Sequence, residues 1–293
     1  DKPAKKEQRA RMGPDDCHGA GLRLRPAHLH EVCREQPAVP WFEVHICNFL
    51  GGGLNRALLH RVAESYPLSF HGVNLNLGGT DPLNEHYLGK LRTAVDEFQP
   101  ALVSEHACFT AHDGLHFHDL LPLPYTWGAV EHLASRIRQV QDCLRRPILI
   151  ENISRYYAYP ESDLSEGEFL CAVCRKSGCG LLLDLNNAYV NQCNLGLDLM
   201  EFIQSLPLEQ VQEVHLGGYS RQGELLIDSH GCAPCPAVWD YFTAFCELKP
   251  DVPCLIEWDN ALPPLAELLQ LQARASKIMG DSGNATRARQ SAA

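Results

Sequence analysis

The distribution of apolar residues along the chain predicts eight short buried strands. Each apolar run is rich in β-forming residues or is bounded by turn-forming residues, and several runs are almost continuously apolar. Such runs are typical of parallel strands that are covered on both faces. The predicted strands are residues 21–25, 41–45, 68–72, 102–106, 147–152, 180–187, 211–218 and 253–259.

Helical patterns separate these strands. In residues 127–145, Val130, Leu133 and Ile137 recur at the spacing of one helix face. Ser165 and Glu168 have the spacing of a capping box, which predicts that a helix over 165–177 begins there. The other predicted helices are residues 27–36, 54–65, 84–98, 198–205, 237–248 and 264–278.

A strand followed by a helix therefore occurs eight times. This order predicts an α/β protein with a single-domain (β/α)8 TIM barrel. A doubly wound open sheet is the alternative, and the absence of a G-x-G-x-x-G motif makes it less favourable. We expect the barrel to span residues 19–278, between a flexible N-terminal arm at 1–18 and a flexible C-terminal tail at 279–293.

Acidic, imidazole and amide side chains stand at the ends of most predicted strands. In a TIM barrel these carboxyl ends meet at one face, where the active site lies. Any one of these residues could simply cap a helix or bond to a backbone carbonyl. So many carboxylates and imidazoles at one barrel mouth would repel one another and lose solvation, and few Lys or Arg residues stand at the strand ends to neutralise them.

Bound cations would resolve this conflict. Mixed imidazole and carboxylate ligands suit zinc, iron or manganese, and the number of candidate ligands exceeds what one ion takes, which indicates two or three metal ions. We predict as ligands His71, His106, Glu151, Asp184, His215, Asp228, His230 and Glu257. Roles in supporting the ligands or contacting substrate are predicted for Asn152, Asn187 and Asp259. Glu105 is expected to face the helix layer, and Glu43 and His45 are left unassigned. The loop histidines His112, His116 and His118 are expected to be exposed.

Charge and cysteine content restrict partners and compartment. The formal net charge is −11, which argues against nucleic acid or an anionic membrane as the main partner. No apolar stretch of about 18 residues is present to span a membrane. The thirteen cysteines cannot all be paired, and we expect free thiols in a reducing cytoplasm. Two C-x-x-C pairs occur: Cys171 and Cys174 fit an ordinary helix, whereas Cys232 and Cys235 lie in a Pro-rich loop where a redox or soft-metal role is open.

An ordered set of motifs resembles one known family, the multinuclear non-haem iron-dependent oxidative enzymes. The resemblance covers about residues 19–270, nearly the whole predicted barrel. The individual motifs are unspecific, but their order along the chain is highly specific. They are GLRLRPAHL, FEVH, SFHGVNLNLGG, VSEH, DLLPLPYT, ILIENIS, LLLDLNNAYVN, EVHLGGY, LIDSHG, VWDYF and LIEWD.

The resemblance implies a TIM barrel that holds two or three iron ions in mixed Fe(II)/Fe(III) states and uses O2 as co-substrate. Members modify cysteines of ribosomally made precursor peptides, for example to oxazolone–thioamide or thiooxazole groups or by excision of the β-carbon. Many act with a partner protein that recognises the precursor peptide. Cys47, Gly217 and Tyr219 depart from the residues that many members carry, which puts the substrate and product in doubt rather than the metal site.

Two other interpretations use the same barrel. Xylose-isomerase-like isomerases and endonuclease-IV-like hydrolases also place His, Glu and Asp around divalent metals at strand ends. The nuclease needs a basic face, which the net charge opposes, and the isomerase usually needs a Lys near the metals, which no strand end offers. A non-catalytic metal carrier ranks last, because deeply held ligands suit rapid metal exchange poorly.

Overall fold

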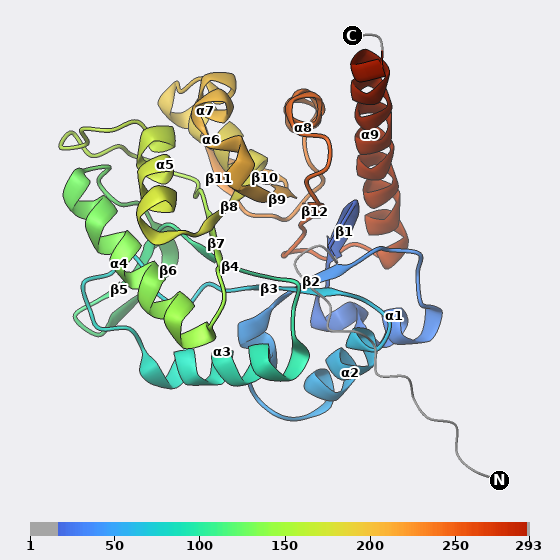
Figure 1. Ribbon diagram of the computed structural model, residues 1–293. Coiled ribbons are helices and arrows are strands. Elements are labelled where there is room, and N and C mark those ends of the chain that lie inside the picture. Colours follow the sequence, from blue (N-terminus) through green and yellow to red (C-terminus); the bar gives the residue numbers. More distant parts are fainter. Residues whose placement is uncertain (1–16, 292–293) are drawn as a thin grey trace.

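Eight parallel strands close into a barrel in the computed structural model, which describes residues 17–291 (Figure 1). The predicted TIM barrel is confirmed. Going round the barrel, the strands are β1 (Ala20–Arg23), β12 (Cys254–Ile256), β9 (Val211–Leu216), β8 (Gly180–Asp184), β7 (Leu149–Glu151), β4 (Leu102–His106), β3 (Leu68–His71) and β2 (Phe42–His45), and β2 pairs with β1 to close the ring.

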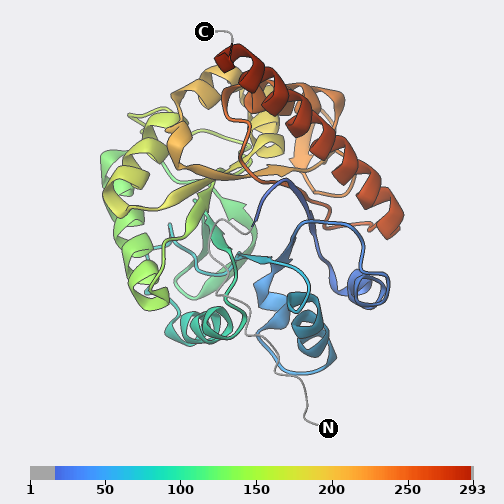
Figure 2. The same cartoon turned by 45° about the vertical axis from the view of Figure 1, so that its right-hand side comes forward.

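Helices surround this barrel on its outer face (Figure 2). Apolar stripes pack them against the strands; in α4, for example, Val130, Leu133 and Ile137 are fully buried. The helices are α1 (Leu29–Glu35), α2 (Leu54–Ala63), α3 (Glu85–Phe98), α4 (Trp127–Leu144), α5 (Glu166–Ser177), α6 (Leu185–Leu195), α7 (Leu199–Ser205), α8 (Pro236–Leu248) and α9 (Leu265–Ser291), with 3-10 turns at Pro26–His28, Ile46–Phe49 and Leu208–Gln210.

Two loops on the carboxyl side of the barrel carry hairpins of their own. The hairpin after β4 consists of β5 (Phe109–His112) and β6 (Leu115–Leu121), and the hairpin after β9 consists of β10 (Tyr219–Gln222) and β11 (Leu225–Asp228). Each is a separate two-stranded antiparallel sheet. The second hairpin ends at Asp228, so it delivers Asp228 and the following His230 to the barrel mouth.

Among the boundaries that differ from prediction or fall outside the description, three matter most. The strand predicted over 180–187 ends at Asp184, because the Asp184 side chain accepts a hydrogen bond from the backbone N–H of Asn187 and caps α6. The last helix continues beyond its predicted end at 278 to Ser291, through most of the segment interpreted as a tail. Residues 1–16 of the predicted N-terminal arm lie outside the described residues. The capping box of Ser165 and Glu168 is confirmed.

The barrel interior is divided into an apolar floor and a polar upper part. Near the strand starts, a buried cluster fills the interior with Trp41, Leu102, Leu149, Leu182 and Leu255. Gly21 makes room for it, because a Cβ there would lie 2.4 Å from the Trp41 ring. Side chains alternate along a strand, so positions two and four residues further on also point inward. Those inward positions are the polar strand-end residues.

Candidate metal centre

The first group of converging side chains comes from β3, β4 and β7. Glu151 Oε2 lies 3.2 Å from both His71 Nε2 and His106 Nε2, and the two ring nitrogens are 3.3 Å apart. Atoms that bind one transition-metal ion at about 2.0–2.1 Å are themselves about 3.0–3.4 Å apart. These three atoms therefore have the spacing of one face of a coordination polyhedron. All three side chains are at least 95% buried.

The second group shares Glu151 with the first. Glu151, Asp184, His215 and Glu257 each place one ligand-type atom within 4.8 Å of the others. His215 Nδ1 is 3.0 Å from Glu257 Oε2 and 3.9 Å from Glu151 Oε1. Because one oxygen of Glu151 belongs to each group, the carboxylate stands between them, as a metal-bridging carboxylate does.

Asp228 and His230 lie beside this second group. His230 Nε2 is 2.9 Å from Asp228 Oδ1 and 3.7 Å from Asp184 Oδ2. The His230 backbone is left-handed, with φ of 43°, and its ring lies over Gly217, where a Cβ would be 2.2 Å away. The glycine thus allows the histidine to reach the cluster. All eight predicted ligands are brought together at the carboxyl ends of the strands.

The unpaired atoms of this cluster fit a bound cation. In the described part of the chain, several buried atoms have no hydrogen-bond partner, namely Glu151 Oε2, Asp184 Oδ2, His215 Nδ1, His230 Nε2 and Glu257 Oε2. Burial raises the pKa of Glu151 to about 8 and also raises the pKa of Asp184. A cation among these atoms would stabilise the ionised carboxylates and use the orphaned lone pairs. The imidazole and carboxylate donor set suits iron, zinc or manganese.

Three of the buried asparagines in this region join β7 and β8 to α6, and a fourth, Asn186, donates to Asp228 Oδ1 at 2.9 Å. Asn152 donates to Asp184 O at 3.0 Å and accepts from Asp184 N at 2.9 Å. Asn187 donates to Asn152 O at 3.1 Å and contacts Glu151 Oε1 at 3.4 Å. One helix turn later, Asn191 donates to the backbone carbonyl of Ile153. Asn152 therefore positions the Asp184 backbone, whereas Asn187 still has its buried Oδ1 without a hydrogen-bond partner among the described residues.

A buried arginine corrects the expectation that the strand ends lack cations. Arg23 on β1 is 2% exposed, and its Nη2 lies 2.6 Å from Glu257 Oε1 and 2.8 Å from Glu43 Oε1. Although burial opposes it, the neighbouring carboxylates, Glu257 foremost, raise the pKa of Arg23. The alternation in GLRLR was the available signal: it turns Leu22 and Leu24 to the helices and Arg23 into the barrel.

Behind His215 lies a pair of carboxylates: Glu43, which the sequence analysis left unassigned, and Glu213, which it did not name. Glu43 Oε1 is 3.2 Å and Glu213 Oε1 is 3.6 Å from His215 Nε2, and both side chains are fully buried. Despite burial, His215 and Arg23 lower the pKa of Glu43 to about 2, whereas burial and Glu43 raise the pKa of Glu213 to about 8. The ionised Glu43 carboxylate thus lies in ion-pair contact with the Nε2 side of the ring, while Nδ1 lies toward the cluster.

The remaining strand-end residues take supporting places. Asp259 contacts Arg25 at 2.9 Å and His45 Nε2 at 3.2 Å, at the partly exposed edge of the cluster. Glu105 alternates with the inward-pointing His106 along β4, so its side chain points away from the barrel interior. It is buried, accepts a hydrogen bond from the backbone N–H of Leu75 and lies 3.3 Å from His106 Nδ1. No pattern in the sequence indicates that the β3–α3 loop folds over this carboxylate.

The other candidates lie apart from the cluster. His112, His116 and His118 are exposed on the β5–β6 hairpin, as expected. Cys232 is exposed, and its thiol donates to Tyr219 O at 3.2 Å; Cys235 is the N-cap residue of α8. In residues 17–291 no two cysteines are joined by a disulfide.

Comparison with known proteins identifies sequence relatives of the whole barrel. The sequence profile of a family described as "RiPP precursor modification enzyme MbnB/TglH/ChrH" matches residues 19–280. A UPF0276 protein of Chromobacterium violaceum is 43% identical over 260 residues, which cover 89% of this chain and 94% of that protein. The UPF0276 protein AM1_3026 of Acaryochloris marina is 42% identical over 251 residues, 86% of this chain and 91% of that protein.

Solved structures resemble the chain in fold. An L-ribulose 3-epimerase has a TM-score of 0.59 at 12% identity and covers 94% of this chain and 97% of its own. Endonuclease IV from Thermus thermophilus has a TM-score of 0.58 at 16% identity and covers 88% of this chain and 99% of its own. At these identities the likeness concerns the TIM barrel alone.

Proposed function

The chain belongs to the MbnB/TglH/ChrH family of RiPP precursor modification enzymes, and from this premise we propose that it is an iron-dependent oxidase. Its substrate would be a cysteine-containing, ribosomally synthesised precursor peptide, and O2 would be the co-substrate. The observation that carries the proposal is the position of Glu151, which belongs to two adjoining groups of imidazole and carboxylate donors. Such sharing supports a centre of at least two ions rather than one isolated metal.

The number of irons follows from how the donors divide. The first group, His71, His106 and Glu151, would hold one ion. The second group, through Asp184, His215 and Glu257, would hold another. Asp228 and His230, close to Asp184, would complete a third position. We therefore propose two or three irons in mixed Fe(II)/Fe(III) states.

Bound iron would supply a binding position for the cysteine thiolate and the electrons that reduce O2. The protein's own residues prepare that chemistry. Arg23 offsets part of the negative charge of Glu43 and Glu257 without occupying a donor position. Glu43 holds the His215 ring in one orientation. The near-complete burial of these side chains excludes water, which would otherwise compete with the thiolate and screen the charges.

The opening of the cluster is where substrate would be oriented. His45 and Asp259 form a pair at its partly exposed edge, with side-chain exposures of 13% and 16%. Asp259 is held in turn by Arg25. We propose that this pair contacts polar atoms of the peptide next to the reacting cysteine. Asn187, through its unpartnered Oδ1, is the second candidate for such a contact.

Compartment and partners follow from the same proposal. We propose a cytoplasmic enzyme, supported by the absence of disulfides in residues 17–291, and a partner protein that recognises the precursor peptide. Within the described residues, no helix is both long and apolar enough to cross a membrane.

The decisive experiment is metal analysis of protein purified without added metal, with Mössbauer and EPR spectra taken anaerobically and after exposure to O2. Two or three irons per chain with a coupled, O2-sensitive mixed-valent signal are expected. A single zinc or manganese that is inert to O2 would overturn the oxidase. That result would favour a divalent-metal isomerase or hydrolase on the same barrel.

A further inference from the structure

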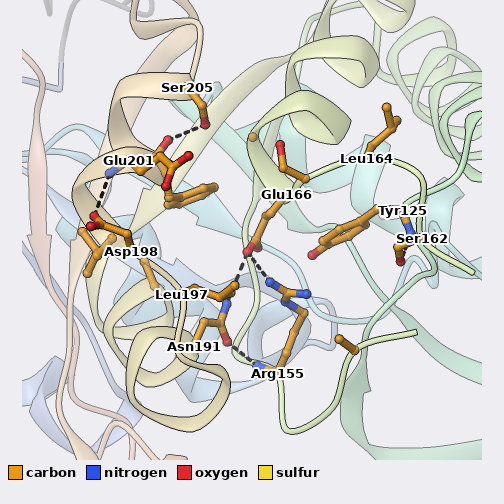
Figure 3. Close-up of a pocket in the computed structure, with 16 residues that line it drawn as sticks. Tyr125, Arg155, Ser162, Leu164, Glu166, Asn191, Leu197, Asp198, Glu201 and Ser205 are labelled. Atoms are coloured by element: carbon orange, nitrogen blue, oxygen red, sulfur yellow. Dashed lines mark hydrogen bonds and ion pairs between the residues drawn. The ribbon is translucent and has the colours of Figure 1, made fainter. Parts of the chain in front are cut away.

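A separate cavity lies outside the barrel, between the N-terminal part of α5, the helices α6 and α7, and the loop that follows β7 (Figure 3). Its volume is about 350 Å³. Apolar side chains form most of its wall, among them Tyr125, Leu164, Leu197 and Phe202. A space of this size is at the lower end of the range of small-ligand cavities, and one long side chain fits inside it.

The inner end of this cavity is a buried ion pair. Arg155 Nη2 donates to Glu166 Oε2 at 2.8 Å, and the Arg155 guanidinium lies over the Tyr125 ring, 4.9 Å from its centroid. Arg155 is 7% and Glu166 9% exposed. Glu166 Oε1 is buried and makes no hydrogen bond of regular geometry with the described residues, although the Tyr125 hydroxyl interacts with this carboxylate. A carboxylate oxygen in that state is costly, and a donor from a ligand would satisfy it.

Further carboxylates stand at the cavity's outer side. Asp198, the N-cap residue of α7, and Glu201, within α7, line the cavity, and both are exposed. Counted with Glu166, three carboxylates face one guanidinium, so the cavity carries a net negative charge. An anionic ligand is therefore disfavoured, and a cation with an apolar stem fits both the wall and the charge.

We propose that this cavity binds the side chain of a lysine of the peptide substrate. The four methylene groups would lie along Leu164, Leu197 and Phe202, and the ammonium group would donate to Glu166 Oε1. Lysine combines an apolar stem with several donors on a compact cation, which is what the narrow wall and the orphaned oxygen require. The inference rests on the proposed function, because it takes a peptide as the substrate.

The cavity is tied to the metal cluster through two shared segments. Ala188 and Asn191 line it from α6, whose N-cap residue is Asp184. Arg155 lies four positions after Glu151, the last residue of β7. The backbone N–H of Arg155 donates a hydrogen bond to Asn191 Oδ1 at 2.6 Å. A lysine held here would anchor the peptide beside the cluster without contacting any predicted ligand.

The test uses capped single residues as probes, so it needs neither iron nor turnover. Binding of N-acetyl-lysine methylamide is compared with N-acetyl-norleucine methylamide, which keeps the stem but lacks the ammonium, by ligand-observed NMR. The lysine probe should bind about tenfold more tightly, as one charge-assisted hydrogen bond provides. Equal binding of the norleucine probe would overturn the proposal, as would equally tight binding of n-butylamine, which would indicate a free amine as ligand.

Three variants locate the binding. Glu166→Gln should remove the preference for lysine, and Ala158→Trp, at an exposed lining position, should block both probes. Ala38→Trp, exposed in the α1–β2 loop, is the matched control and should bind as wild type. Lysine binding that survives Ala158→Trp would overturn the site. Iron content is measured on the same samples. Absence of iron would contradict the proposed function, whereas loss of the lysine preference with iron present would contradict only the lysine site.

Discussion

Two regions of this protein are rich in histidine, and they differ in almost every other respect. His71, His106 and His215 end parallel strands, are at least 95% buried, and lie within 3.2–3.9 Å of Glu151. The β5–β6 hairpin carries His116 and His118 on exposed positions. The comparison teaches that imidazole content alone says little. What distinguishes a metal site is convergence on one point, with buried carboxylates that the neighbouring cationic side chains neutralise only in part.

The largest expected effect comes from removing a strand-end donor. His71→Ala, His215→Ala and Glu257→Ala should each lower bound iron and abolish activity. The loss should exceed the about 10–100-fold that removal of a supporting residue costs. Metal analysis and turnover with the precursor peptide check this, and circular dichroism controls for folding. Wild-type iron content and activity in all three variants would refute the site.

The next effect concerns the carboxylates behind His215. Glu43→Gln removes an ionised acceptor and should weaken iron binding about 10–100-fold. Glu213→Gln is the matched control, because a pKa of about 8 leaves Glu213 largely protonated at neutral pH and Gln resembles that state. Iron affinity, measured by competition with a chelator, should fall more in the first variant. The reverse order would show that Glu213, and not Glu43, orients the ring.

A smaller effect is expected for Asn152, whose side chain hydrogen-bonds to the backbone of Asp184. Asn152→Ala removes two hydrogen bonds to the Asp184 backbone and leaves the buried Asp184 N–H without its Asn152 partner, which should cost about 1–3 kcal/mol of unfolding free energy. Denaturant unfolding of the metal-free protein measures it. An unchanged midpoint together with lost activity would instead indicate that Asn152 contacts the substrate.

Cys232 and Cys235, just before α8, lie close in sequence to the predicted ligand His230. A double variant tests whether they take part in catalysis. If Cys232 and Cys235 are bystanders, the double Ser variant should keep activity within about twofold, since substitutions away from buried features change little. A folded but inactive double variant would instead establish a redox or thiol-relay role for the pair.

The smallest effect is expected in the hairpin. His116→Ala and His118→Ala should leave iron content unchanged and alter stability by less than about 0.5 kcal/mol. Their comparison with His71→Ala is the direct test of the contrast between the two regions. Iron loss in either hairpin variant would mean that the hairpin folds over the barrel mouth when metal is present.

The barrel and the eight converging side chains could be predicted from the sequence because both depend on local pattern. Strand periodicity and the polar residue at each strand end are visible in the chain, and parallel pairing brings those ends together. Arg23 and Glu213 were missed, and Glu43 was left unassigned, because all three stand before the last residues of their predicted strands. Their roles depend on the neighbouring strand, which sequence spacing does not display. The fold of the β3–α3 loop over Glu105 and the cavity beside Arg155 depend likewise on tertiary packing.

The barrel closes between its first and last strands, and this order has a consequence for biogenesis. A ribosome that has released the chain as far as β7 has already supplied His71, His106 and Glu151. Glu257 and its ion pair with Arg23, 234 positions away, come only with β12. We expect the nascent chain to lack a complete centre until synthesis has nearly ended. The proposed metal ions would therefore be acquired only when nearly the whole chain has been made.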